Sequence, residues 1–360
     1  MDWEKATLLI VALVGVIWLL VIIFSPGLVK VPDLKPTSSA RLTLNRLSYE
    51  EKIGQRFIIG FQGTSVTPEL ENKIKELHPG GVLLLGRNLK DGDQLERLTD
   101  NLQEIALEDT GLPLFISVDQ EGEPLCRINW LECTSPSAIE SEEQALEIGL
   151  ERGKRLKELG VNLNLAPVLD KSYPGDFVYP RTFQSRDAGF LAKSFISGQQ
   201  KHVFSVLKHF PGYTTIDFDP EREKLAKLDF IPDIDQFKIA MKADPVMVMT
   251  SNVVYNELSD YPLTMSPEGI DFVREELNPG LIISENLLSP VMKENYGLED
   301  TVVETAEAGV DILLVAGFNE IKDTRKAIEA LEKKKIDNQQ FNESLLKIIK
   351  LKQKINEKNY

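Results

Sequence analysis

A lysine and a histidine at the end of an apolar run are the first residues of this sequence whose types could do chemistry. The run 203–207 leads into Lys208 and His209, and Pro211-Gly212 then closes it with a turn signal. A cation and an imidazole at the exit of a buried strand are well placed to meet a ligand. The competing interpretation is a surface lysine and a packed histidine before an ordinary turn, so the ends of the neighbouring runs decide between the two.

Those neighbouring runs also end in polar residues. The third run ends in Asp119-Gln120-Glu121-Gly122 and the fourth in Asp170, and the sixth and seventh end in Ser251-Asn252 and Ser284-Glu285-Asn286. A single carboxylate at a solvated strand end is common, but five polar exits indicate a shared rim. Carboxylate, amide, Lys, His and Arg side chains hydrogen-bond hydroxyls and amides, as a sugar would require.

Predicted strands and predicted helices alternate along the chain, and together they must position this rim. Eight apolar runs are separated by stretches with helical apolar spacing, and the runs read as nearly continuous, buried, parallel strands. Eight strands in about 300 residues predict a closed (β/α)₈ barrel, whose reactive groups lie at the C-terminal ends of its strands. An open doubly wound sheet is the alternative, weakened because no G-x-G-x-x-G follows the first strand. The predicted strands are 56–61, 81–86, 114–119, 161–168, 203–210, 246–250, 281–284 and 310–315.

The predicted helices occupy 69–77, 93–107, 142–159, 188–201, 234–242, 266–276 and 302–308, and a charged helical tail over 321–360 is expected to pack beside the barrel.

Net charge and cysteine content limit the classes of function that this chain could have. The 360 residues carry a net charge of -15, which disfavours nucleic acid as a partner. Cys126 and Cys133 lack the spacing of a metal site. The sequence does not decide whether they form a disulfide or stay reduced. We also predict that the protein binds no metal and no cofactor and that it is a monomer.

The N-terminus suggests a membrane segment. The 19 residues from Ala6 to Phe24 carry no charge, and as a helix they would span about 28 Å, close to the hydrocarbon thickness of a bilayer. A cleaved signal peptide is the alternative, but its apolar region would be shorter. The sequence predicts a transmembrane anchor over 1–28, a linker over 29–46 and a barrel body over 47–360. A strict positive-inside count would put the body in the cytoplasm by a small margin; because that margin is small and the body large, an extracytoplasmic body is the prediction.

Four segments of the body resemble the N-terminal barrel domain of glycoside hydrolase family 3, in particular its bacterial β-N-acetylhexosaminidase branch. The segments are 47–55, 118–122, 162–170 and 208–212. The resemblance covers roughly residues 47–350. It implies hydrolysis of terminal β-linked N-acetylglucosamine, or a related sugar of cell-wall or glycan fragments, with retention of configuration.

The resemblance also implies a set of sugar-binding residues. The aspartate of the segment 118–122 and an arginine eight residues later correspond to Asp119 and Arg127. The Lys-His pair corresponds to Lys208 and His209, and an arginine of an Arg-Ser-Phe-Gly stretch corresponds to Arg181. All five are predicted to bind substrate.

The catalytic positions depart from the family pattern. The family's nucleophilic aspartate corresponds to Glu285, and its Asp-Ser-His loop falls on the segment 219–221, while Tyr213-Thr214 replaces a second His-Gly. Glutamate can serve as nucleophile or as proton donor. We therefore predict that Glu285 attacks the anomeric carbon and that Glu221, oriented by Asp219, protonates the leaving oxygen. The alternative is a relative that binds sugars without cleaving them, because the extra methylene of glutamate displaces the attacking atom.

Overall fold

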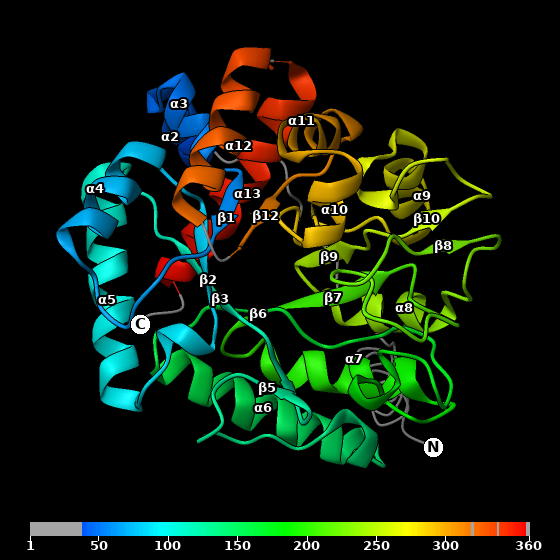
Figure 1. Cartoon of the computed structure of the whole chain (residues 1–360). Helices are drawn as coiled ribbons and strands as arrows, with labels where there is room; N and C mark the ends of the chain where they lie inside the picture. The colour runs from blue at the N-terminus through cyan, green and yellow to red at the C-terminus, as the bar shows by residue number, and fades with distance from the viewer. Residues whose placement is uncertain (1–37, 318–319, 337, 358–360) are drawn as a thin grey trace, which may run out of the picture. The chain divides into compact units, whose positions relative to one another are not determined.

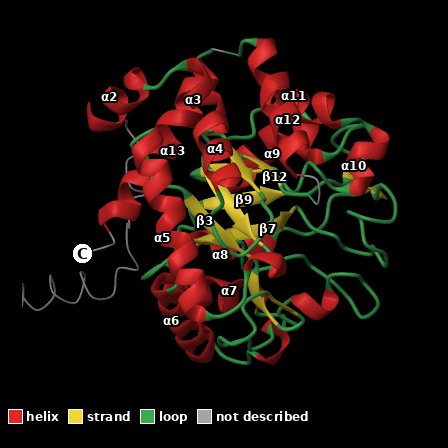
Figure 2. Cartoon of the chain, turned by 60° about the vertical axis from the view of Figure 1, so that its left-hand side comes forward, coloured by secondary structure: helices red, strands yellow, loops and turns green. Residues whose placement is uncertain are grey.

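The computed structural model describes residues 38–317, 320–336 and 338–357. Eight parallel strands form its centre, and each lies in one of the eight predicted runs (Figures 1 and 2). Apolar, β-branched-rich segments with both faces covered are typical of such strands. The strands are β1 (Phe57–Ile59), β2 (Gly81–Leu84), β3 (Phe115–Val118), β6 (Leu163–Asn164), β7 (Phe204–Phe210), β9 (Met247–Thr250), β11 (Leu281–Ile283) and β12 (Leu313–Val315).

The strands follow one another around a barrel. Their order is β11-β9-β7-β6-β3-β2-β1-β12, and every pairing between neighbours in this sheet is parallel. A parallel bridge between Ile283 and Ile312 joins the two ends of this order, and Ser284 N donates to Ile312 O at 2.9 Å. The predicted (β/α)₈ barrel is therefore confirmed, and the open sheet is excluded.

Helices surround the strands, as Figure 2 shows. Local signals explain their starts: Thr67 and Ser266 each cap a helix that begins with proline, and Asp91 and Ser141 cap two more. The stretch 234–242 is split because its last turn is a 3₁₀ helix. The helices are α2 (Ser38–Arg46), α3 (Tyr49–Gly54), α4 (Pro68–Leu77), α5 (Gly92–Asp109), α6 (Glu142–Glu158), α7 (Ala188–Gln199), α8 (Asp235–Ala240), α9 (Pro267–Leu277), α10 (Pro290–Asn295), α11 (Leu298–Ala308), α12 (Glu320–Lys334) and α13 (Gln339–Glu357).

Two small sheets lie outside the barrel. The hairpin of β4 (Gln120–Gly122) and β5 (Leu125–Cys126) follows β3, and β8 (Lys227–Leu228) pairs in parallel with β10 (Val254–Tyr255). Both sheets belong to segments that follow the C-terminal ends of barrel strands. They therefore build up the end of the barrel where the polar exits were predicted.

Of the predicted tail, α12 packs beside the barrel as expected, because Ile328 and Leu331 share a buried cluster with residues of α4 and α5, whereas α13 differs from the prediction. Side chains of α13 share one buried cluster with residues of the barrel strands, and Lys352 Nζ donates to Gln55 Oε1 at 2.5 Å, just before β1. Helix α13 therefore covers the N-terminal end of the barrel and closes it. The α13 residues in this buried cluster are Ile348, Leu351 and Ile355.

The predicted membrane anchor is not supported. In the part of the chain that the structure describes, no helix is long and apolar enough to span a bilayer, and the segment 6–24 lies outside that part. This finding contradicts the predicted localisation, in which a single helix tethers the body to a membrane. Of the predicted linker 29–46, residues 38–46 form α2, whose Ser39 Oγ accepts a hydrogen bond from Gln353 Nε2 of α13 at 3.1 Å.

Candidate active site

The predicted site residues gather at the C-terminal end of the barrel. Lys208 and His209 lie at the end of β7, Asp119 directly follows β3, and Glu285 comes two residues after β11. Because the strands are parallel, these exits meet at one end, although the residues are far apart in the chain. The ion pairs and hydrogen bonds below show which of the residues meet.

A network of ion pairs forms one half of the site, which we call the binding half after the role predicted for four of its residues. Its members are Asp119, Glu121, Arg127, Arg181 and Lys208. Lys208 Nζ lies 2.7 Å from Asp119 Oδ1 and 2.6 Å from Glu121 Oε1. Arg181 binds Glu121 with two nitrogens, at 2.9 and 2.8 Å. Burial opposes ionisation of Glu121, but the charges of Arg181 and Lys208 lower its pKa to about 2. The carboxylates of Asp119 and Glu121 likewise outweigh burial and raise the pKa of Lys208.

Arg127 lies at the edge of this network. Its Nη2 is 3.8 Å from Asp119 Oδ2, and its side chain keeps 34% of its surface exposed. Its Nε is buried and has no hydrogen-bond partner. Because a buried donor without a partner is costly, this nitrogen is suited to a group that arrives with a ligand.

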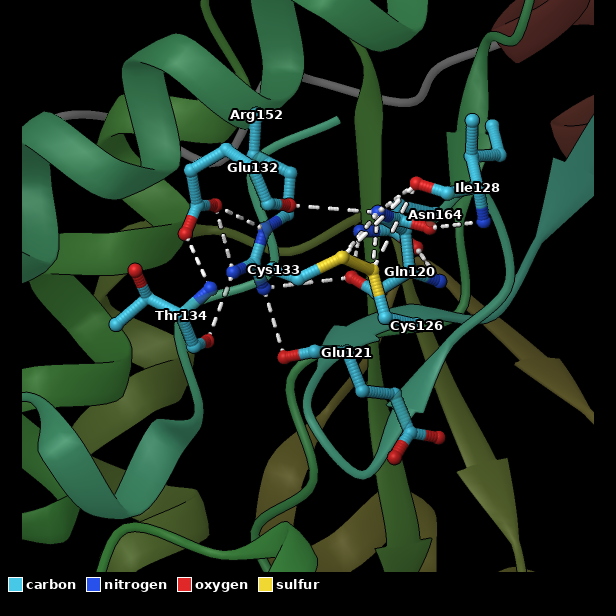
Figure 3. The surroundings of a disulfide bond; sticks show 9 residues. All are labelled: Gln120, Glu121, Cys126, Ile128, Glu132, Cys133, Thr134, Arg152 and Asn164. Atoms are coloured by element: carbon cyan, nitrogen blue, oxygen red, sulfur yellow. Dashed lines mark hydrogen bonds and ion pairs between the residues drawn. A yellow bond between two sulfur atoms is a disulfide. The ribbon is translucent and has the colours of Figure 1, made fainter. Parts of the chain in front are cut away.

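A disulfide closes the loop that carries Arg127. Cys126 and Cys133 are joined, which decides between the two states left open by the sequence (Figure 3). Inside the loop, the side-chain amide of Gln120 accepts from Ile128 N at 2.9 Å and donates to Ile128 O at 3.2 Å. The loop is therefore tied both covalently and through a buried amide.

Arg152 of α6 contacts the same loop (Figure 3). Its guanidinium is buried and binds Glu132 Oε2 at 2.9 and 2.8 Å, Thr134 O at 3.0 Å and Glu121 O at 2.7 Å. This one side chain thus links the disulfide loop to the strand that carries Glu121.

His209 is held by a buried carboxylate. Asp170 Oδ2 accepts from His209 N and contacts its Nδ1, both at 3.0 Å. Burial lowers the pKa of His209, against the opposing effect of Asp170. The imidazole is therefore neutral at neutral pH, and the contact with Asp170 assigns the proton to Nδ1. Its Nε2 then carries a lone pair that can accept a hydrogen bond.

Glu285 belongs to the other half of the site, which we call the catalytic half after the roles predicted for Asp219, Glu221 and Glu285. This half also includes Tyr213 and Asn252. Glu285 is 5% exposed. Its Oε2 accepts from Asn252 N at 2.7 Å, and its Oε1 accepts from the hydroxyl of Tyr213. Burial and the charge of Glu221 raise the pKa of Glu285, while these two donors oppose the rise.

Glu221 lies in the loop after β7. Asp219 Oδ1 accepts from the backbone N of Glu221 at 3.0 Å, and Glu221 O accepts from Val291 N of α10 at 3.2 Å. Burial, followed by the charge of Asp219, raises the pKa of Glu221. The charge of Glu221 also contributes to the raised pKa of Glu285.

Sequence reasoning did not select four residues that the structure places in the site: Glu121, Asp170, Tyr213 and Asn252. Glu121 and Tyr213 are two and four residues from a selected residue, whereas Asp170 and Asn252 lie at strand exits far along the chain from any selected residue. Their roles follow from side-chain direction around the barrel, which no local pattern contains. Among the residues that the structure describes, no group of three or more His, Cys, Asp or Glu side chains is arranged to hold a metal ion.

The glycosyl hydrolase family 3 N-terminal domain matches residues 48–351 of this chain. The chain belongs to glycoside hydrolase family 3. Beta-hexosaminidase A of Pseudoalteromonas piscicida is 30% identical over 339 residues, which cover 81% of this chain and 56% of that protein. Beta-hexosaminidase LpqI of Mycobacterium bovis is 26% identical over 302 residues, covering 76% of this chain and 75% of that protein.

Solved structures of the family have the same fold. A glycoside hydrolase family 3 beta-N-acetylglucosaminidase from Paenibacillus sp. superimposes with a TM-score of 0.79 at 28% identity, covering 85% of this chain and 62% of that one. A beta-N-acetylhexosaminidase from Beutenbergia cavernae superimposes with a TM-score of 0.77 at 23% identity, covering 85% and 99%. This chain thus spans a little more than half the length of the Pseudoalteromonas and Paenibacillus relatives.

Proposed function

We propose that this chain is a retaining glycosidase that removes terminal β-linked N-acetylglucosamine, or a closely related sugar, from cell-wall or glycan fragments. The observation that carries the proposal is the buried carboxylate of Glu285, which Asn252 N and the Tyr213 hydroxyl hold at the end of the barrel that also carries the ion pair of Lys208 with Asp119. A retaining glycosidase needs one carboxylate as nucleophile and a second carboxyl group as acid and base, and in this proposal these are Glu285 and Glu221. The names of the relatives described above support the same activity and sugar.

In this proposal the binding half holds the sugar. The carboxylate of Asp119 accepts hydrogen bonds from sugar hydroxyls, while Lys208, Arg181 and the free Nε of Arg127 donate to sugar oxygens. A further sugar hydroxyl donates a hydrogen bond to His209 Nε2. Because the ion pairs already fix these side chains, little conformational entropy is lost when the sugar binds.

The first chemical step breaks the glycosidic bond. Glu285, as a carboxylate, attacks the anomeric carbon, and the bond from that carbon to the leaving oxygen breaks. Glu221 transfers its proton to the leaving oxygen. Asn252 N and the Tyr213 hydroxyl are both donors to Glu285, so the negative charge of the pair is best held there and the proton on Glu221.

The second step releases the sugar. Glu221, now a carboxylate, takes a proton from water as the water oxygen attacks the anomeric carbon. The bond from that carbon to Glu285 breaks, and both carboxyl groups return to their starting states. Two displacements at one carbon retain its configuration. In both steps Asp219 positions Glu221 through the backbone amide and supports its protonated form by charge.

The test is turnover of p-nitrophenyl N-acetyl-β-D-glucosaminide by the full chain and by Glu285→Gln, with Glu147→Gln as control, because Glu147 is an exposed residue of α6. We expect Glu285→Gln to lose at least about 1,000-fold in kcat and Glu147→Gln to keep wild-type rates. Saturable binding of N-acetylglucosamine without turnover in any of the three proteins would contradict the proposal and leave the sugar-binding alternative.

A further inference from the structure

The carboxylate of Glu285 has two fixed hydrogen-bond donors, and one of them is a tyrosine side chain. Asn252 N donates to Oε2 at 2.7 Å, and the Tyr213 hydroxyl donates to Oε1. The backbone N of Glu285 donates to Thr250 O at 3.2 Å. The main chain of Glu285 and both of its carboxylate oxygens are thus held.

Tyr213 is itself fixed by the residues that hold His209. Its backbone N donates to Asp170 Oδ1 at 2.8 Å, and its ring stacks on the His209 ring with centroids 4.7 Å apart and planes 9° apart. Asp170 also binds His209 through Oδ2. The side chain of Tyr213, 1% exposed, therefore connects the imidazole of the site to the carboxylate of Glu285.

Glu285 needs such support for a physical reason. Glutamate has one more rotatable bond than aspartate, and each free bond lowers the fraction of time that its carboxylate points at a reacting carbon. A phenol that donates to Oε1 restricts this motion. Burial and the neighbouring carboxylates raise the pKa of Tyr213, so that its proton stays on the phenol and the donation has one direction.

We propose that Tyr213 is a positioning residue that aligns the Glu285 carboxylate for attack and favours its ionised form. This inference rests on the proposed function for its effect on rate, but its effect on Glu285 itself does not depend on turnover. Tyr213 acts through Glu285 and is not assigned a contact with the substrate.

Tyr255 provides a matched control. It is also 1% exposed and close to the site, but its hydroxyl donates to Gly212 O at 2.8 Å and lies 2.8 Å from Ser251 Oγ instead of binding Glu285. Tyr213→Phe and Tyr255→Phe each remove one buried hydroxyl and keep the ring. Only the first removes a donor to Glu285.

The first experiment measures kcat, KM and the pH dependence of kcat for the full chain and both variants. We expect Tyr213→Phe to lower kcat by about 10- to 100-fold, the range for a hydrogen bond to a charged group, with KM within about twofold. Because the lost donor favoured ionised Glu285, the acidic limb of the profile should move to higher pH. Tyr255→Phe should leave that limb in place. An unchanged limb and kcat in Tyr213→Phe would overturn the inference.

The second experiment separates this inference from the proposed activity. Protein labelled with ¹³C at the glutamate carboxyl carbon is titrated by NMR, and the Glu285 signal is assigned by its loss in Glu285→Gln. We expect this signal to titrate at higher pH in Tyr213→Phe than in wild type, and at the wild-type pH in Tyr255→Phe. This holds whether or not the chain turns over a glycoside. Identical titration of Glu285 in wild type and Tyr213→Phe would contradict the inference.

Discussion

Glu121 and Glu285 are both buried carboxyl groups at the same end of the barrel, yet their surroundings act on them in opposite directions. Glu121 contacts Lys208 and Arg181, whose charges outweigh burial and lower its pKa to about 2. Glu285 contacts a phenol and a backbone amide, and burial together with the charge of Glu221 raises its pKa. One carboxyl group is fixed as an anion, whereas the other belongs to a pair that can gain or lose a proton.

In the proposed mechanism, this difference separates the residues that hold a substrate from those that react with it. A network of permanent charges keeps its geometry over a wide range of pH, which suits recognition of hydroxyl groups. Carboxyl groups whose pKa values lie near the working pH can exchange protons during a reaction, which suits acid and base catalysis. The contrast gives three predictions, from the largest expected effect to the smallest.

The largest effect concerns Glu221, the proposed proton donor of the catalytic half. We expect Glu221→Gln to lower kcat by about 100- to 10,000-fold on an alkyl glycoside. The loss should be much smaller on a p-nitrophenyl glycoside, because a nitrophenolate leaves without protonation. The basic limb of the pH profile, which reports the raised pKa of Glu221, should also disappear.

The measurement is the ratio of rates on the two substrates, and Glu294→Gln on the exposed surface of α10 is the control. Equal losses on both leaving groups would show that Glu221 does not supply the proton, and the contrast between the two halves would then lose its catalytic side.

The middle effect concerns the fixed anion of the binding half. Glu121→Gln leaves Lys208 and Arg181 with less compensation, and we expect the free energy of unfolding to fall by about 3 kcal/mol at neutral pH. Because the folded-state pKa of Glu121, about 2, lies below its ordinary value of 4.5, the stabilisation is present above that ordinary value. It is lost as the pH falls from about 4.5 to 2.

Urea denaturation of wild type and variant across this range tests the prediction, with Glu123→Gln, an exposed residue of the same hairpin, as control. A stability difference that stays constant from pH 7 to pH 2 would mean that the charge of Glu121 does not stabilise the network.

The smallest effect concerns the disulfide loop. Replacing both Cys126 and Cys133 by serine frees the loop that carries Arg127, and the cost of ordering one side chain on binding is about 0.5–1.5 kcal/mol. We therefore expect KM to rise by about two- to tenfold while kcat stays within about twofold. A reductant should produce the same change in wild type and none in the double variant. A fall in kcat at constant KM would place the loop in the catalytic half instead.

Sequence patterns predicted the barrel because each of its strands is a short, nearly continuous apolar run. They predicted Asp119, Lys208, His209 and Glu285 as a group, because parallel strands bring their exits to one end. In contrast, the position of α13 depends on apolar side chains at helical spacing that fit either the outside or the end of a barrel, and the sequence does not distinguish the two.

Contacts between loops were also beyond the sequence. Nothing in the local pattern indicates that Asp170 would bind both His209 and Tyr213, or that the Tyr213 hydroxyl would reach Glu285 across 72 positions of the chain. These contacts depend on side-chain direction at the rim of the barrel. The sequence alone could not show whether Cys126 and Cys133 are paired, because pairing depends on the distance between them in the fold. Their Cα atoms are 5.8 Å apart, within the range for a disulfide.

The central claim is that Glu285 forms a covalent bond with the sugar, and trapping that intermediate tests it most directly. The full chain is incubated with a fluorinated N-acetylglucosaminyl fluoride, which forms the glycosyl-enzyme faster than water removes it, and is then examined by intact-mass and peptide mass spectrometry. We predict the mass of one glycosyl unit on the peptide that contains Glu285, and none on Glu285→Gln. An adduct on a different residue, or none while the chromogenic substrate is still hydrolysed, would contradict the account.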